Sequence, residues 1–169
     1  MKKFVIIAFV AVSGLFSVNA MAQAKIAHIN AQALVTAMPE TAKAETDLQT
    51  FAKSLEGDGK AMYDEYQKKL AEFNEKAASM TDNMKEIKAK DLQDIQKRIQ
   101  DYSEASQNKI QEKQAQLLKP IYDKARKAIE DVAKEKGYGY VIDNSNGMLL
   151  VSPAGDDILV PVKTKLGIK

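Results

Sequence analysis

The fold of this chain is decided by the stretch ETAKAETDLQTFAKSLEGDGKAMYDEYQKKLAEFNEKAASM (residues 40–80) and its continuation TDNMKEIKAKDLQDIQKRIQDYSEASQNKIQEKQAQLLKPIYDKARKAIEDVAKEK (residues 81–136). The stretch contains one proline, Pro120, and two glycines, Gly57 and Gly59. Ala, Glu, Lys, Gln, Leu and Met supply most of the other positions, and these are the strongest helix formers. The composition therefore predicts helix over nearly the whole stretch.

Apolar side chains recur in this stretch at spacings of three and four residues, which is the period of one helix face. Most other positions are charged or polar, so each helix has one narrow apolar stripe. From Ile99 to Val132 the spacing is eleven residues, which does not produce the supercoil of a leucine zipper. We expect two long helices packed as a hairpin without a regular heptad. The stripe contains Leu48, Phe51, Leu55, Met62, Tyr66, Leu70, Phe73, Ala77, Met80, Met84, Ile87, Ile95, Ile99, Tyr102, Ile110, Leu117, Ile121, Ile129 and Val132.

The turn between the two helices is expected at residues 79–83, where Thr81 or Asp82 can cap the second helix. Gly57-Asp58-Gly59 is a competing turn. We favour residues 79–83 because the apolar stripe continues in phase after Gly59. Gly57 and Gly59 then form a weak point inside the first helix, and we predict that they act as a hinge.

The predicted hairpin also assigns a role to Pro120. Glu40 lies as far before Thr81 as residue 122 lies after it, so Pro120 is expected near the level at which the first helix begins. A proline inside a helix removes one hydrogen bond and kinks the axis. We predict that Pro120 marks the junction between a projecting arm, residues 40–120, and a compact base. At 1.5 Å per residue, such an arm is on the order of 60 Å long.

The first residues have the pattern of a secretory signal peptide. Lys2 and Lys3 precede the apolar run 4–18, and Ala20-Met21-Ala22 is a small-x-small cleavage site, so cleavage is predicted between Ala22 and Gln23. A membrane anchor is disfavoured because polar residues and a glycine interrupt a run already shorter than about 20 residues. Residues 1–22 are therefore expected to be removed and the chain to be exported to the periplasm.

Removal of this segment makes the chain electrostatically neutral. Loss of its two lysines leaves 23 of the 25 basic side chains against 23 acidic ones, whereas binding to nucleic acid or to an anionic membrane favours a basic excess. We therefore expect no nucleic-acid partner and no stable insertion into a membrane. The chain has no cysteine, so it uses no disulfides.

The segments on either side of the arm, 23–39 and 121–169, are expected to form the base. Three short strands are predicted at residues 25–30, 140–143 and 148–151, with a turn at 144–147. Asn30 can cap a brief helix, Gly137 can end the long helix, and a short C-terminal helix is expected between Asp156 or Asp157 and Gly167. Three strands leave two open edges, which a symmetric oligomer could close into a barrel.

The order of these segments resembles the Skp/OmpH family of periplasmic chaperones over the whole exported chain. The residues that carry the resemblance are the signal peptide, KIAHIN (25–30), MPE (38–40), the charged hairpin, Pro120-Ile121, VAKEKGY (132–138), YVID (140–143) and Asp157-Ile158. The resemblance implies a homotrimer with a β-barrel body and three helical arms around a cavity. It also implies an ATP-independent holdase for unfolded outer-membrane β-barrel proteins. This chain differs from the basic arm tips of that family, because residues 75–101 carry six basic and six acidic side chains.

Adaptable apolar side chains along the arm are the candidates for client contact. An unfolded chain presents apolar groups of varied shape, which flexible Met and aromatic side chains accommodate. The competing interpretation places such residues in the seam between the helices, and it is favoured for Leu48, Phe51, Leu70, Phe73, Ile95 and Ile99. Client contact is favoured for Tyr63, Met80 and Met84. The complete set of candidates is Met62, Tyr63, Tyr66, Met80 and Met84.

An enzyme is poorly supported by this sequence. His28 is the only histidine, and the sequence has no Gly-rich phosphate loop and no His, Asp and Glu cluster at metal-ligand spacing. We expect no catalytic residues, no metal and no cofactor. The main alternative to a chaperone is an exported coiled-coil scaffold of the cell envelope without clients, which predicts a sharper heptad and no free apolar side chains on the arms.

Overall fold

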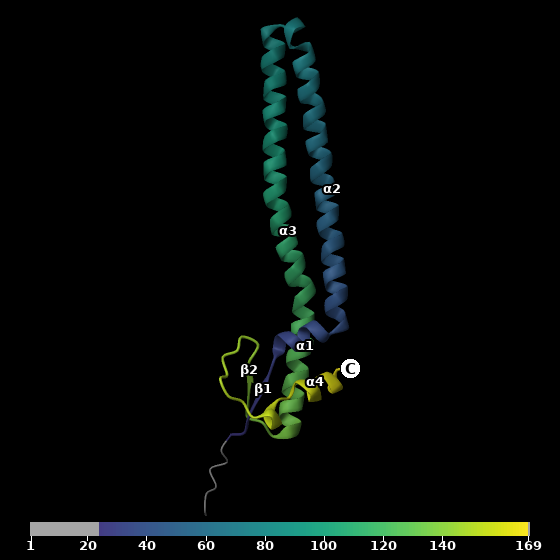
Figure 1. Cartoon of the computed structure of the whole chain (residues 1–169). Helices are drawn as coiled ribbons and strands as arrows, with labels where there is room; N and C mark the ends of the chain where they lie inside the picture. The colour runs from purple at the N-terminus through teal and green to yellow at the C-terminus, as the bar shows by residue number, and fades with distance from the viewer. Residues whose placement is uncertain (1–23, 169) are drawn as a thin grey trace, which may run out of the picture.

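The computed structural model describes residues 24–168 and shows a long helical hairpin that projects from a small base (Figure 1). The hairpin consists of α2 (Pro39–Lys76) and α3 (Asp82–Lys136). The mainly helical fold with a small β base is therefore confirmed, whereas the oligomeric barrel stays a prediction. The expected signal peptide and its cleavage site at Ala22 and Gln23 lie outside the described residues. The base contains β1 (Ile26–Ile29), α1 (Ala31–Ala37), the end of α3, β2 (Tyr140–Asp143), the 3-10 turn η2 (Ala154–Asp156) and α4 (Leu159–Lys165).

The turn at the tip lies where the sequence predicts it. The 3-10 turn η1 (Ala77–Ser79) follows α2, and Met80 is extended. Thr81 is the N-cap of α3, with its hydroxyl oxygen accepting a hydrogen bond from the Met84 N–H at 3.3 Å. This contact satisfies one of the free N–H groups at the helix start. The competing turn at Gly57-Asp58-Gly59 is wrong, because both glycines lie inside α2.

The two helices are in the register expected from a hairpin centred at Thr81. Near the base, Lys124 of α3 forms an ion pair with Glu40 in the first turn of α2. Near the tip, Lys69 Nζ lies 3.1 Å from Asp91 Oδ2 across the helices. Pro120 lies inside α3, close to the level of Glu40. The helix continues through the proline into the base, and the kink expected there stays a prediction.

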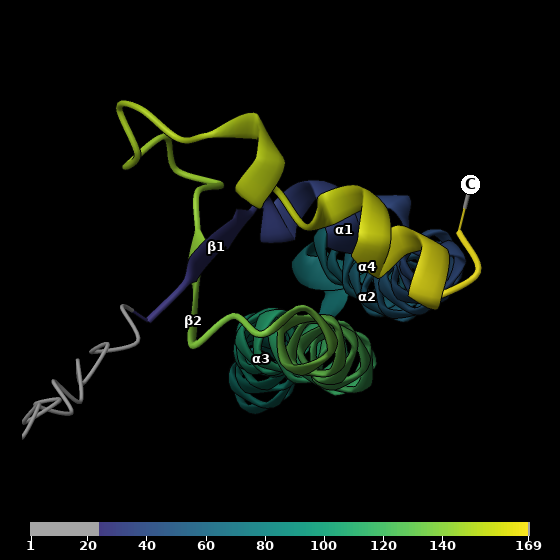
Figure 2. The ribbon, with the colours of Figure 1, turned by 90° about the horizontal axis from the view of Figure 1, so that it is seen from below.

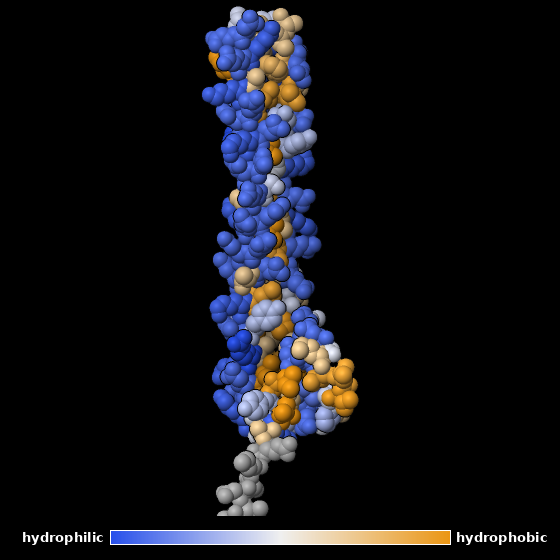
Figure 3. Space-filling model, turned by 90° about the vertical axis from the view of Figure 1, so that its left-hand side faces the viewer, coloured by the Kyte–Doolittle hydropathy of each residue, from blue (hydrophilic) through white to orange (hydrophobic). Residues whose placement is uncertain are grey.

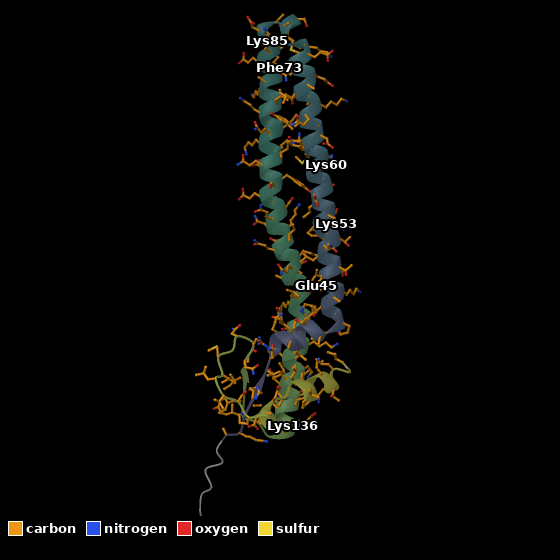
Figure 4. The ribbon with its side chains drawn as sticks, in the orientation of Figure 1. Glu45, Lys53, Lys60, Phe73, Lys85 and Lys136 are labelled. Carbon is orange, nitrogen blue, oxygen red and sulfur yellow. The ribbon has the colours of Figure 1, made fainter. Side chains whose placement is uncertain are left out.

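The seam between α2 and α3 is thin. Side chains from both helices fill the space between them along the arm, and Phe73 lies near the tip (Figure 4). Away from the base, only Leu55 and Ile95 are buried within the described arm, and the other stripe residues are half-buried or exposed. Two helices bury few side chains completely, so the hairpin keeps part of its apolar stripe in contact with solvent.

The hydrophobic core lies in the base. It is formed where β1, α1, α4 and the last turns of α3 meet, around the fully buried side chains of Ile29, Leu34, Met38, Ile158 and Val162. Seen from below, the strands lie beside the helical pair (Figure 2). Gly137 ends α3 in the left-handed conformation at φ 72°, and Asp157 Oδ1 accepts a hydrogen bond from the Leu159 N–H at the start of α4.

The sheet contains two parallel strands within the described residues. β1 pairs with β2 in the register Ile26 to Tyr140 and Ile29 to Asp143, and a single bridge joins His28 to Asp157. The expected third strand at residues 148–151 is wrong, because this segment has no backbone partner and Leu150 is 97% exposed.

The turn after β2 is bound to the start of α1. The Asp143 carboxylate accepts a hydrogen bond from the Ala31 N–H at 3.1 Å, and the Ser145 hydroxyl oxygen accepts one from the Gln32 N–H at 3.0 Å. These bonds hold the turn on the N-terminus of α1. The following segment 148–151 forms no backbone hydrogen bond with β2.

Candidate functional site

Large apolar side chains are exposed on two parts of the molecule, the arm and the base. One side of the molecule has an apolar stripe that runs up an otherwise charged arm and meets further apolar surface on the base (Figure 3). Monomeric proteins rarely expose apolar surface in continuous patches unless it binds something. The exposed set consists of Tyr63, Met84 and Ile87 on the arm, and Ile26, Tyr122, Tyr140, Ile142, Met148, Leu150, Val151 and Val160 on the base.

The predicted contact residues are spread along the arm and do not form one pocket. Tyr63 is 52% exposed and Met84 is 44% exposed, as expected for residues that the seam does not use. Met62 and Tyr66 are half-buried in the seam. Tyr63 lies about 25 Å below the tip at 1.5 Å per residue. The arm therefore offers a series of separate apolar contacts.

Met80 and Ile87 also lie near the tip of the arm. Met80 is half-buried and lines a cavity of about 140 Å³ together with Phe73 and Leu92. Ile87 is 53% exposed, three residues after Met84 on the same helix face. Sequence reasoning placed Ile87 in the apolar stripe and did not count it as a contact residue. The available signal was its spacing from Met84, which places both side chains on one face near the end of the hairpin.

The residues assigned to the seam are placed there by the structure. Ile95 is 1% exposed, and the other five are half-buried between the helices. Buried and exposed apolar side chains therefore lie at different positions of the arm. The six seam residues are Leu48, Phe51, Leu70, Phe73, Ile95 and Ile99.

Part of the apolar surface of the base lies on one face of the sheet. Side chains alternate along a strand, so Ile26, Tyr140 and Ile142 share the face opposite the core. They are 50%, 64% and 39% exposed. The segment 148–151 runs beside this face, and Leu149 and Val151 line a cavity of about 470 Å³ together with the sheet residues.

His28 connects this segment to the sheet. The ring is 7% exposed, with Nε2 lying 3.1 Å from the Pro153 carbonyl oxygen and Nδ1 3.2 Å from Asn144 Nδ2. Both ring nitrogens thus hold the two ends of the segment 144–153. These contacts give His28 a structural role in the base.

The ion pairs of the arm stabilise its charged faces. A hydrogen bond from Lys119 lowers the pKa of the Asp123 carboxyl, and one from Lys124 lowers that of Glu40. Burial raises the pKa of Asp143, but hydrogen bonds from Ser145 and from the Ala31 N–H outweigh it, so that this pKa is also lowered. These shifts stabilise the ionised form. They favour salt bridges and helix caps over proton transfer near neutral pH.

The expected hinge and junction residues have distinct surroundings. A β-carbon added to Gly57 would meet nothing within 4 Å, whereas one added to Gly59 would lie 3.5 Å from Tyr102 Cε1. Gly59 therefore faces α3, and Gly57 faces solvent. Pro120 leaves the Gln116 carbonyl without its usual partner in the helix ladder. The hinge and the kink both stay predictions.

Comparison with known proteins gives the family. The model of the family described as outer membrane protein (OmpH-like) matches residues 25–166, which is most of the chain. The chain belongs to the OmpH-like family. The match covers the base and the hairpin together, in the order in which the sequence analysis identified them. Among curated proteins, none matches this OmpH-like chain.

A solved structure has the same fold. It is the crystal structure of a protein from Caulobacter crescentus that is described as a candidate outer membrane chaperone (OmpH-like). The two chains superpose with a TM-score of 0.75 over 85% of this chain and 83% of the other, at 13% sequence identity. In residues 24–168 of the OmpH-like chain, every helix is too short or too polar to span a bilayer.

Proposed function

We propose that this OmpH-like chain is an ATP-independent holdase of the periplasm that keeps unfolded outer-membrane β-barrel proteins from aggregating. The observation that carries the proposal is the apolar stripe of the arm, which a two-helix hairpin leaves partly exposed over its length (Figure 3). A receptor for unfolded chains needs many weak and adaptable apolar contacts instead of one shaped pocket. Tyr63, Met84 and Ile87 supply such contacts at different heights.

The same proposal gives the base an assembling role. Ile26, Tyr140 and Ile142 form an exposed apolar sheet face, and Leu150 and Val151 are almost fully exposed beside it. A small sheet with open edges and one uncovered apolar face is unfavourable in water unless another copy covers it. We propose a homotrimer in which three bases form a closed β-barrel and three arms enclose a cavity, as the family resemblance implies. No cofactor or nucleotide has a part in this mechanism.

In this proposal, the charged faces of the arms keep them soluble. Pairs such as Lys60 with Asp64 and Lys97 with Asp101 cover the surface beside the apolar stripe. Exposed pairs of this kind contribute little to stability because solvent screens them. Their stronger effect is to keep the arms soluble, because a hydrated charged surface does not associate with its copies.

Suppression of aggregation tests the proposal. A urea-unfolded outer-membrane β-barrel protein is diluted into buffer without nucleotide, and turbidity is followed with and without the mature OmpH-like chain. We expect turbidity to fall as the chain is added, with no further effect of ATP. The alternative function, an envelope scaffold without clients, predicts unchanged turbidity at every concentration. Bovine serum albumin at equal mass controls for nonspecific crowding.

A further inference from the structure

Tyr102 of α3 lies against the glycine pair of α2. A β-carbon added to Gly59 would lie 3.5 Å from Tyr102 Cε1 and 3.7 Å from Cδ1, which is ordinary van der Waals contact. The phenol ring therefore occupies the surface that the absent side chain leaves open. The sequence analysis placed Tyr102 in the apolar stripe and gave it no separate role.

The hydroxyl of Tyr102 reaches the backbone of α2. It donates a hydrogen bond to the Leu55 carbonyl oxygen at 3.2 Å and lies 3.4 Å from Asp58 Oδ2. In an α-helix, the Leu55 carbonyl also accepts the N–H of Gly59, four residues later. Tyr102 thus binds the carbonyl whose helical hydrogen bond spans Gly57 and Gly59.

Apart from Tyr102, the helix and the seam have few stabilising features at the level of the glycine pair. Glycine is the poorest helix former except proline, and α2 has two glycines within three residues. On the facing helix, one turn after Tyr102, the hydroxyl of Ser106 is buried without a hydrogen-bond partner among the described residues. The seam here therefore contains a serine where an aliphatic side chain would pack more tightly.

We propose that Tyr102 is a positioning residue that braces α2 at the glycine pair and so controls how far the outer arm bends relative to the base. While the Tyr102 hydroxyl binds the Leu55 carbonyl oxygen, this contact from α3 stabilises the helical hydrogen bonds across Gly57 and Gly59. When it releases, the glycine pair loses its contact with α3 beside a serine without a hydrogen-bond partner among the described residues, and this level opens first. The proposal deepens the holdase function, because arm bending would set which client sizes the cavity admits, but its test needs no client.

Amide hydrogen exchange of the free protein tests the brace. Tyr102→Phe removes only the hydroxyl and keeps the ring on Gly59. Loss of one hydrogen bond predicts that the amides of residues 57–61 exchange about fivefold faster, with little change elsewhere in the arm. Tyr63→Phe is the matched control, because Tyr63 is 52% exposed and its hydroxyl makes no hydrogen bond among the described residues, and it should leave these rates unchanged.

A second measurement reports the bending itself. The chain has no cysteine, so Lys53→Cys and Lys68→Cys, both exposed on α2 on either side of the glycine pair, carry spin labels uniquely. Chains labelled at both positions are diluted into unlabelled protein. We expect a broader distance distribution with Tyr102→Phe and a narrower one with Gly57→Ala and Gly59→Ala. Unchanged exchange rates and unchanged distance widths in Tyr102→Phe would overturn the brace and leave the holdase proposal standing.

Discussion

Met84 and Ile87 are exposed on the same face of the first turns of α3, and this face is not the one that packs on α2. The seam stabilises the hairpin through Leu55 and Ile95, which are buried lower on the arm. A residue can therefore be part of the apolar stripe without stabilising the fold. At the tip, an apolar side chain contributes contact surface at little cost to folding.

Replacing Met84 and Ile87 together distinguishes a role in client contact from a role in the stability of the hairpin. We expect Met84→Ser with Ile87→Ser to reduce protection of an unfolded barrel protein several-fold, while helicity by circular dichroism and oligomer mass stay unchanged. Gln93→Ser with Gln96→Ser is the matched control, because these exposed residues have the same spacing on α3. A loss of helicity in the tip variant would instead place Met84 and Ile87 in the seam.

Asp143 makes stability depend on pH. Its pKa is lowered in the folded chain by the hydrogen bonds from Ser145 and Ala31, which outweigh the effect of burial. The ionised carboxylate thus stabilises the fold above the ordinary value of 3.8, and this contribution is lost as pH falls through the lower folded value. We expect the urea midpoint of Asp143→Asn to fall less steeply below pH 4 than that of the unmodified chain. Equal slopes in the two proteins would contradict the assigned role of these hydrogen bonds.

At the scale of elements, the sequence predicts correctly those helix ends, turns and strands that depend on neighbouring residues alone. The turn at Thr81, the caps at Asn30 and Gly137 and the strand at 140–143 follow from residues within a few positions of each other. The segment 148–151 has a strand-like sequence but no backbone partner, and the turn before it is held by long-range bonds from Asp143 and Ser145 to the start of α1, which the local pattern does not reveal. The brace at Tyr102 was likewise unpredictable, since it joins residues 47 apart in the sequence.

The tip turn depends on one cap. We expect Thr81→Ala to destabilise the start of α3 by about 1 kcal/mol, because the Met84 N–H loses its acceptor. Amide exchange of residues 82–85 should accelerate, with the base unaffected. Thr46→Ala is the control, since the Thr46 hydroxyl bonds to the Ala42 carbonyl in the helix interior and caps no terminus. Equal acceleration at the tip in both variants would argue against the cap.

At the scale of the whole molecule, the sheet face of the base and the stripe of the arm are left uncovered by the chain itself. The core lies between the sheet and the helices and leaves Ile26, Tyr140 and Ile142 facing outward. Sequence alone indicated the hairpin and the open strand edges, but exposure of this face depends on how β1 and β2 pair. The proposed trimer covers this face and directs three arms around one cavity.

A charged residue on the segment 148–151 should separate the copies. We expect Leu150→Asp to convert the oligomer into a folded monomer, because Leu150 is 97% exposed in the single chain and contributes nothing to its core. Val160→Asp is the control, as Val160 is 71% exposed on α4 away from the sheet face. Mass by sedimentation and helicity by circular dichroism check both variants. An unchanged mass for Leu150→Asp would contradict assembly through this surface.

The most direct test of the central claim is the light-scattering mass of the mature chain, alone and after a urea-unfolded outer-membrane β-barrel protein is diluted into it without nucleotide. We expect the protein alone to have the mass of three chains. After mixing, we expect a soluble complex of three chains with one barrel protein. A defined oligomer that leaves the barrel protein to precipitate would contradict the holdase and favour the envelope scaffold.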